Sequence, residues 1–209
     1  MQSKLWVPVL LAAVLWFLMF SPWTASWFNF WWAMTASALI LTAVVFYCTR
    51  RLPGMNVKGW QDFLVNLGLA VLIAVALWVV FYIGDKVSGL LFSFARPQVN
   101  LIYDMKTGLS PHVIGLLLLC IIGPAEEIFW RGYIQRTLSQ NGNSTAAFLI
   151  TTAIYTLVHL PSGNFMLIMA AMTCGLAWGG LYRLMPRRLP AIILSHALWD
   201  AAAFVWFPF

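Results

Sequence analysis

The stretch Gly123-Pro-Ala-Glu126-Glu127-Ile-Phe-Trp-Arg131-Gly132 decides how the rest of this sequence is interpreted. Glu126 and Glu127 are adjacent, and they are the only glutamates among the 209 residues. They follow an apolar run, residues 113–122, that is long enough to carry them well into a lipid bilayer. Carboxylates inside a membrane are costly for folding alone, so the pair is a functional hypothesis by default.

The composition indicates a membrane protein. The chain is 62% hydrophobic and only 9% charged, which excludes an ordinary soluble domain. Its net charge of +6 comes from basic residues in the loops between apolar runs. That placement is typical of residues that orient membrane spans, and it predicts no nucleic-acid partner. We therefore expect an all-α, polytopic membrane helical bundle.

The apolar runs predict about seven transmembrane helices, because each is close to the roughly 20 residues that a helix needs to cross a bilayer. A mixed segment, residues 86–95, is predicted to form an interfacial amphipathic helix. Residues 1–110 are expected to form a scaffold of three spans, and residues 111–209 a catalytic core of four, within one membrane domain. The predicted spans cover residues 5–20, 27–48, 63–83, 113–140, 145–160, 164–182 and 189–207.

The loop charges predict the orientation of these spans. With a cytoplasmic N-terminus, most loop Lys and Arg residues fall on the cytoplasmic side, as the positive-inside rule requires. The segment after the third span also carries Lys86, Arg96 and Lys106, partly balanced by Asp85 and Asp104. We expect an integral, multi-pass protein of a prokaryotic plasma membrane. The sequence carries no prediction of oligomeric state.

Three of the predicted spans carry ionisable residues. Glu127 and Arg131 are four residues apart, so they share a helix face and can form an ion pair. His196 and Asp200 have the same spacing. Such residues are expensive alone in lipid, and the cost falls if they meet around a water-filled cavity. The complete set is Glu126, Glu127, Arg131, His159, His196 and Asp200.

The pairing of Glu127 with Arg131 would leave Glu126 free for chemistry. A free carboxylate facing imidazoles can take a proton from water while the histidines polarise a carbonyl. Alternatively, carboxylate and histidines can bind a metal ion that activates the water. A proton relay in a transporter and purely structural polar contacts are the other interpretations of the same residues.

The order and spacing of these motifs resemble those of the CPBP family, which contains CAAX prenyl proteases and bacteriocin-processing proteins. The motifs are Glu126-Glu127-x-x-x-Arg131-Gly132, Tyr155-x-x-x-His159 and His196-x-x-x-Asp200. The resemblance covers about residues 113–204. It implies an intramembrane endopeptidase acting on membrane-tethered proteins or peptides.

Residue roles follow from this resemblance. Glu126 and His159 would activate the water, and His196 with Asp200 would stabilise the oxyanion, while Glu127 and Arg131 would shape the site. Asp200 stands where the family commonly has Asn, and an ionised carboxylate cannot donate a hydrogen bond to an oxyanion. Asp200 would therefore be protonated, orient His196, or ligate a metal. In the metal alternative the ion, for example zinc, would be held by Glu126, His159, His196 and Asp200.

Other functions remain open alongside the protease. A proton-coupled transporter would use the same cluster as a relay, although no second copy of the Gly123-Pro-Ala-Glu126 stretch appears in the other half of the chain. A family member without catalysis could act as a membrane regulator.

Gly175 and Gly179 form a GxxxG pattern that predicts tight helix packing behind the site. Counting helix rise places His159 roughly 10 Å farther out than Glu126 unless its span tilts or lines a cavity.

Overall fold

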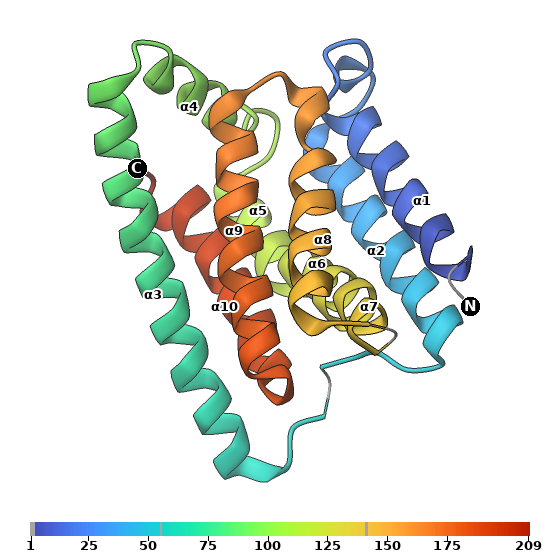
Figure 1. Ribbon diagram of the computed structural model, residues 1–209. Helices are drawn as coiled ribbons and strands as arrows, with labels where there is room; N and C mark the ends of the chain where they lie inside the picture. Colours follow the sequence, from blue (N-terminus) through green and yellow to red (C-terminus); the bar gives the residue numbers. More distant parts are fainter. Residues whose placement is uncertain (1–2, 55, 141) are drawn as a thin grey trace.

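The computed structural model describes residues 3–54, 56–140 and 142–209, and within these ranges all regular structure is helical (Figure 1). This confirms the all-α prediction. The helices of the N-terminal half are α1 (Ser3–Phe20), η1 (Ala25–Trp27), α2 (Phe30–Thr49), α3 (Gly59–Leu91) and α4 (Ala95–Asp104). Those of the C-terminal half are α5 (Pro111–Leu117), η2 (Leu118–Ile122), α6 (Gly123–Glu127), η3 (Ile128–Gln135), α7 (Arg136–Gln140), α8 (Ser144–Leu157), η4 (Leu160–Ser162), α9 (Phe165–Leu184), η5 (Pro186–Arg188), α10 (Leu189–Ala201) and η6 (Ala202–Trp206).

Six helical stretches in the described residues are long and apolar enough to cross a membrane, which is close to the predicted seven. The first predicted span forms a shorter apolar helix, α1, which packs against α2. The protein therefore has the helices of a multi-pass membrane protein. The six stretches are Phe30–Thr49, Gly59–Leu91, Pro111–Gln140, Ser144–Ser162, Phe165–Leu184 and Pro186–Trp206.

Local sequence explains where several of these helices begin. An Asn or Ser side chain at the position before the helix accepts hydrogen bonds from the first free backbone N–H groups, which otherwise lack partners. Asn29 caps α2 in this way, accepting from the backbone N–H of Trp31 at 3.1 Å. Asn143 caps α8, and Asn164 caps α9. Each of these caps therefore marks the residue before the helix, at the N-terminal end of an apolar run.

The interfacial helix predicted at residues 86–95 is wrong in position. Helix α3 continues through Gly84 and Asp85 as far as Leu91, and a separate short helix, α4, begins only at Ala95. The reason is an ion pair between Asp85 on α3 and Arg96 on α4, which gives the buried carboxylate a partner. Helix α4 packs against α3 and α9, so it closes one end of the bundle (Figure 1).

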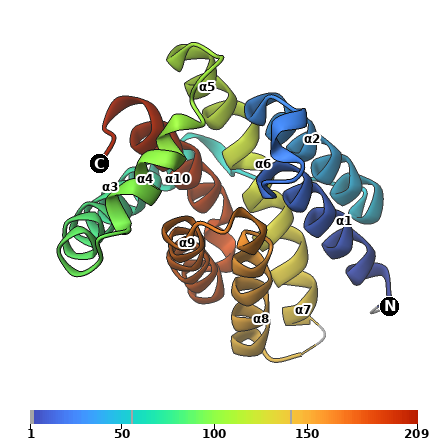
Figure 2. The ribbon, with the colours of Figure 1, turned by 90° about the horizontal axis from the view of Figure 1, so that it is seen from above.

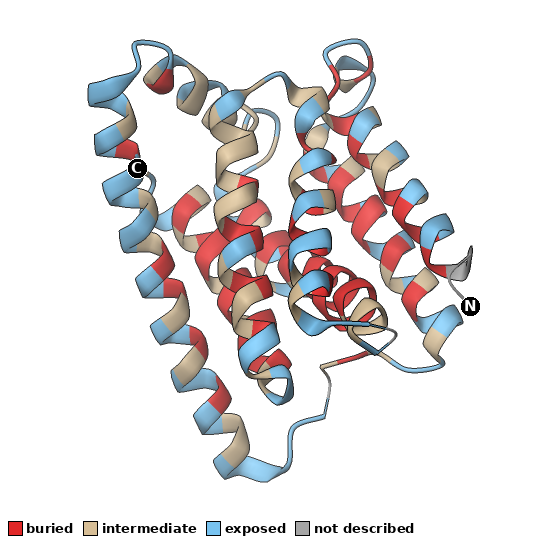
Figure 3. Ribbon diagram, in the orientation of Figure 1, coloured by how far each residue is buried: buried red, intermediate tan, exposed pale blue. Residues whose placement is uncertain are grey.

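The stretches that carry all predicted site residues except His159 occupy the middle of the bundle, where Figure 2 shows α6 and α10 (Figures 2 and 3). Helix α10 packs against α3 and α6, and α8 packs against α9. In the most apolar window of Pro111–Gln140 and of Pro186–Trp206, 67% of the residues are buried, compared with 22% for Gly59–Leu91. Helix α3 instead exposes large apolar side chains, as expected for a surface that faces lipid. Burial therefore separates the site helices from the periphery.

Two glycines allow the close helix contacts that this arrangement needs. A Cβ atom on Gly123 would lie 2.8 Å from the Cα of Ala197, so α6 and α10 touch through their backbones. A Cβ atom on Gly175 would lie 2.9 Å from Cγ2 of Thr152, on α8. The tight packing predicted from the GxxxG pattern is confirmed between α9 and α8. Small residues in membrane helices commonly allow such approach.

Candidate active site

The glutamate pair lies in the middle of one continuous helical stretch, Pro111–Gln140. Within it, the five-residue α6 that carries both glutamates is flanked by two π-helical segments, η2 and η3. Wider π-helical turns occur mostly at functional sites, because they re-aim side chains relative to a regular α-helix. The apolar pattern of these residues contains no signal for this local change in winding.

Glu127 is fully buried, and one of its carboxylate oxygens contacts two partner side chains. Its Oε1 atom accepts a hydrogen bond from Nη1 of Arg131 at 2.7 Å, as the four-residue spacing predicts. The same oxygen lies 2.7 Å from Nδ1 of His196 on α10. Arg131, which is 1% exposed, also donates to the carbonyl of Cys174 at 3.3 Å. Glu127 therefore links the helix stretch that carries it to α10.

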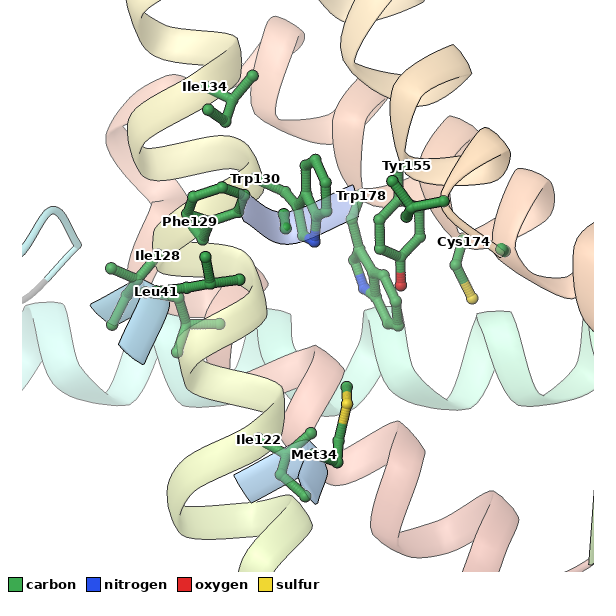
Figure 4. Close-up of a cluster of buried hydrophobic side chains, with 14 of the residues drawn as sticks. Met34, Leu41, Ile122, Ile128, Phe129, Trp130, Ile134, Tyr155, Cys174 and Trp178 are labelled. Carbon is green, nitrogen blue, oxygen red and sulfur yellow. The ribbon is translucent and has the colours of Figure 1, made fainter. Parts of the chain in front are cut away.

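Aromatic side chains enclose this ion pair. The guanidinium of Arg131 lies 5.0 Å from the ring centroid of Tyr155 and 5.9 Å from that of Trp178. The His196 ring stacks on Trp178, with centroids 3.8 Å apart. Trp130, Tyr155 and Trp178 belong to the buried core (Figure 4). Charges surrounded by aromatic faces in this way are fixed in place and shielded from lipid.

His196 lies between two carboxylates, because its second nitrogen, Nε2, is 3.3 Å from Oδ2 of Asp200. The sequence interpretation placed His196 opposite Glu126, whereas the closest carboxylate to Nδ1 is that of Glu127. Of the three roles considered for Asp200, this contact corresponds to orienting His196. A neutral imidazole can donate from only one nitrogen, so two ionised carboxylates would require a protonated His196.

Glu126 faces a cavity of 410 Å³ that brings together residues from distant parts of the chain. One of its oxygens, Oε2, has no hydrogen-bond partner among the described residues. The same cavity is lined by the other predicted catalytic side chains, namely His159, His196 and Asp200. Helix rise alone predicts that His159 and Glu126 lie at different depths in the membrane. Both side chains nevertheless line this one cavity. Glu127 and Arg131 lie behind the cavity wall and do not line it.

Trp16, on α1, is a site residue that the sequence interpretation missed. Its indole Nε1 donates a hydrogen bond to Nε2 of His159 at 3.2 Å, and Nδ1 of His159 lies 2.7 Å from the carbonyl oxygen of Tyr155. A carbonyl only accepts, so Nδ1 carries the hydrogen and Nε2 is the acceptor. Trp16 is one of many apolar-run tryptophans, so no sequence signal distinguished it.

The arrangement of donors does not fit the metal centre considered as an alternative. Among the described residues no group of three His, Cys, Asp or Glu side chains is placed to hold a metal ion. Both nitrogens of His159 and both of His196 already have protein partners. A metal ligand needs a free lone pair on an imidazole nitrogen. We therefore derive no step through a metal.

Comparison with protein families finds one similarity in this region. Residues 108–202 match the family model described as type II CAAX prenyl endopeptidase Rce1-like. This region is therefore similar to the Rce1-like family. The chain matches no curated protein and no solved structure.

The Rce1-like region contains each of the six predicted site residues, and it agrees with the resemblance to the CPBP family. The match indicates a CAAX protease, and the apolar helices indicate that it is a membrane protein. Trp16, which contacts His159, and Asp85, which lines the same cavity, both lie outside it. The N-terminal helices therefore complete a cavity that the Rce1-like region alone does not enclose.

Proposed function

We propose that this protein is an intramembrane endopeptidase that hydrolyses a peptide bond of a membrane-attached protein or peptide without a metal ion. The observation that carries the proposal is the Glu126 carboxylate, which has an unpartnered oxygen and shares a cavity with His159, His196 and Asp200. The Rce1-like match supports a substrate of the CAAX type, whose reactive segment lies near a membrane anchor.

Glu126 is the general base of this mechanism. Its carboxylate takes a proton from a water molecule in the cavity, and the water oxygen attacks the carbonyl carbon of the scissile bond. His159 orients the water through Nε2, which exchanges its 3.2 Å contact with Trp16 for one with the water. Glu126 then gives the proton to the leaving nitrogen, so the amine and acid products form and the carboxylate is restored.

His196 stabilises the negative charge that develops on the carbonyl oxygen. Its Nδ1 contact with Glu127 is short, at 2.7 Å, whereas its Nε2 contact with Asp200 is longer, at 3.3 Å. The Nε2–H group is therefore the donor that can turn to the substrate oxygen. A charged donor fixed in a site that excludes water stabilises an oxyanion strongly. Asp200 holds the ring in place before the substrate binds.

The test is cleavage of a membrane-tethered reporter peptide by the full chain in lipid nanodiscs, with matched substrates that carry or lack a prenylated cysteine. Wild type is compared with Glu126→Gln and His159→Ala, and Leu72→Ala on the exposed face of α3 is the control. We expect cleavage by wild type and the control only, with the prenylated substrate preferred. Equal turnover by all four proteins would overturn the proposal.

A further inference from the structure

A second cavity lies away from the candidate active site. It has a volume of 530 Å³ and shares no lining residue with the cavity at Glu126. Its walls come from α7, the start of α8, the end of α9, η5, the start of α10 and the loop between α2 and α3. These helix ends lie together at one end of the bundle, at the bottom of Figure 1. The cavity therefore opens where membrane spans meet their connecting loops.

Three arginines from three separate elements line this cavity, and we refer to it as the basic pocket. They are Arg136 on α7, Arg183 on α9 and Arg187 on η5. No Asp or Glu lines the pocket. Within the described parts of the chain, none of the three arginines forms an ion pair with a carboxylate. Three cations around one hollow without a counter-charge repel one another, and an anion would relieve that repulsion.

The basic pocket also contains residues with hydroxyl groups, which can bind phosphate oxygens. The hydroxyl groups of Ser139, Ser144 and Tyr182 line it together with the arginines. The guanidinium of Arg183 is held by a hydrogen bond from its Nε to Oγ1 of Thr145 at 3.0 Å, which leaves its two terminal nitrogens free to donate. A planar guanidinium fork matches two oxygens of one phosphate group. The pocket thus has the chemistry of a phosphate site.

The surroundings of the basic pocket favour a phosphate that belongs to a lipid. Leu189 and Pro190 add apolar surface to its lining, and the neighbouring Leu184 side chain is exposed. Helix α2 ends at this same end of the bundle in Figure 1, and Arg50 and Arg51 follow it directly in the sequence. Our sequence analysis predicts that this end is cytoplasmic, where anionic phospholipids are concentrated and basic pockets between spans bind their head groups.

We infer that the basic pocket binds the phosphate head group of an anionic phospholipid, with Arg136, Arg183 and Arg187 as its ligands. This site is independent of the proposed peptidase reaction. Its occupation would tie the end of the stretch that carries Glu126 to the start of the helix that carries His196, since Arg136 and Leu189 both line it. A ligand that binds only the folded state also raises the stability of that state.

Arginines near span ends also serve to orient a protein in the membrane, and a matched control separates that role from lipid binding. The test variant is R136Q/R183Q/R187Q, which removes the three charges of the basic pocket. The control is R50Q/R51Q/K58Q. It removes three charges from the neighbouring loop at residues that do not line the pocket. The two variants have the same net charge, so a nonspecific electrostatic effect would change both equally.

The measurement is native mass spectrometry of the detergent-purified full chain, titrated with phosphatidic acid, with phosphatidylcholine, and with inorganic phosphate. We expect saturable binding of one phosphatidic acid, weakened at least about tenfold in R136Q/R183Q/R187Q and unchanged in the control. Arg183→Gln alone, at an exposed position, should show a smaller loss in the same direction and serves if the triple variant does not fold.

Three outcomes would overturn the inference. Equal weakening in both triple variants would mean that general charge attracts the lipid. Equal binding of phosphatidic acid and phosphatidylcholine would mean that the acyl chains or the bundle surface decide the affinity. Tight binding of inorganic phosphate that excludes phosphatidic acid would assign the pocket to a free anion rather than to a lipid.

Discussion

The two helical stretches that carry most of the site differ sharply from the long helix α3 beside them. Pro111–Gln140 and Pro186–Trp206 are each 67% buried in their most apolar windows, whereas Gly59–Leu91 is 22% buried. All three are apolar, so the difference lies in what their side chains touch. The site helices pack against protein on most sides, and α3 exposes large apolar side chains to the surroundings.

The difference in burial explains why most of the ionisable groups of the site lie in the central stretches. Glu127, Arg131 and His196 can stay deep in the bundle because each finds a charged or polar partner there. The buried carboxylate of α3, that of Asp85, also has a partner in Arg96. An unpaired charge facing lipid would have no such compensation. Four substitutions and one metal-removal experiment test this contrast, in order of decreasing effect.

Replacing Glu126 by Gln should abolish the proposed cleavage while leaving the fold intact. Loss of a general base typically lowers turnover by about 100- to 10,000-fold. The side chain faces the cavity, and Gln keeps its shape, so thermal unfolding in detergent should be unchanged. The measurement is reporter cleavage at saturating substrate. Turnover close to that of wild type would assign the base to another group.

Replacing Glu127 by Ala should chiefly damage folding. It would leave the buried Arg131 without its carboxylate, and breaking a buried ion pair typically costs about 3–5 kcal/mol. We expect a large fall in the unfolding temperature. The control is Asp62→Ala, which breaks the more exposed pair with Arg188 and should change stability little.

The conservative variant Glu127→Gln sharpens the division between the two glutamates. Gln retains an oxygen that can accept from Arg131, so this variant should keep more activity than Glu126→Gln. The reverse order of activities would show that the roles of the pair are exchanged.

Replacing Trp16 by Phe tests whether the N-terminal half contributes to the chemistry. The change removes the donor that orients the His159 ring before water takes its place at Nε2, which predicts a loss in kcat of about five- to a hundredfold with little change in KM. Trp6→Phe, at an exposed position on the same helix, is the control. Faster turnover in Trp16→Phe would show that the indole competes with water instead of positioning the imidazole.

Removal of metal ions should have the smallest effect. Because the imidazole nitrogens of both histidines already have protein partners, we expect EDTA treatment to leave cleavage unchanged and added zinc to give no increase. Loss of activity with EDTA and its recovery with zinc would contradict the proposed mechanism. In that case His159 would have to leave Trp16 to bind the ion.

Much of this molecule was predictable from local sequence patterns. Apolar runs separated by basic loops predicted the helical membrane fold, since a helix satisfies its own backbone hydrogen bonds in lipid. The four-residue spacing predicted the Glu127–Arg131 pair, because that contact forms within one helix. The order of the motifs predicted a resemblance with which the match to residues 108–202 is consistent. The catalytic roles and the orientation in the membrane stay predictions.

Only the tertiary structure decided which residues from different helices meet. The contact of His196 with Glu127 depends on the backbone approach of α6 and α10 at Gly123. The bond from Trp16 to His159 joins positions 143 residues apart, and the position of α4 depends on the ion pair between Asp85 and Arg96. Spacing along one helix fixes which side chains share a face, but contacts between helices depend on packing and winding across the whole bundle. The sequence therefore predicted that Glu127 pairs with Arg131 and leaves Glu126 free, and only the fold showed that Glu126 faces a cavity that His159 also lines.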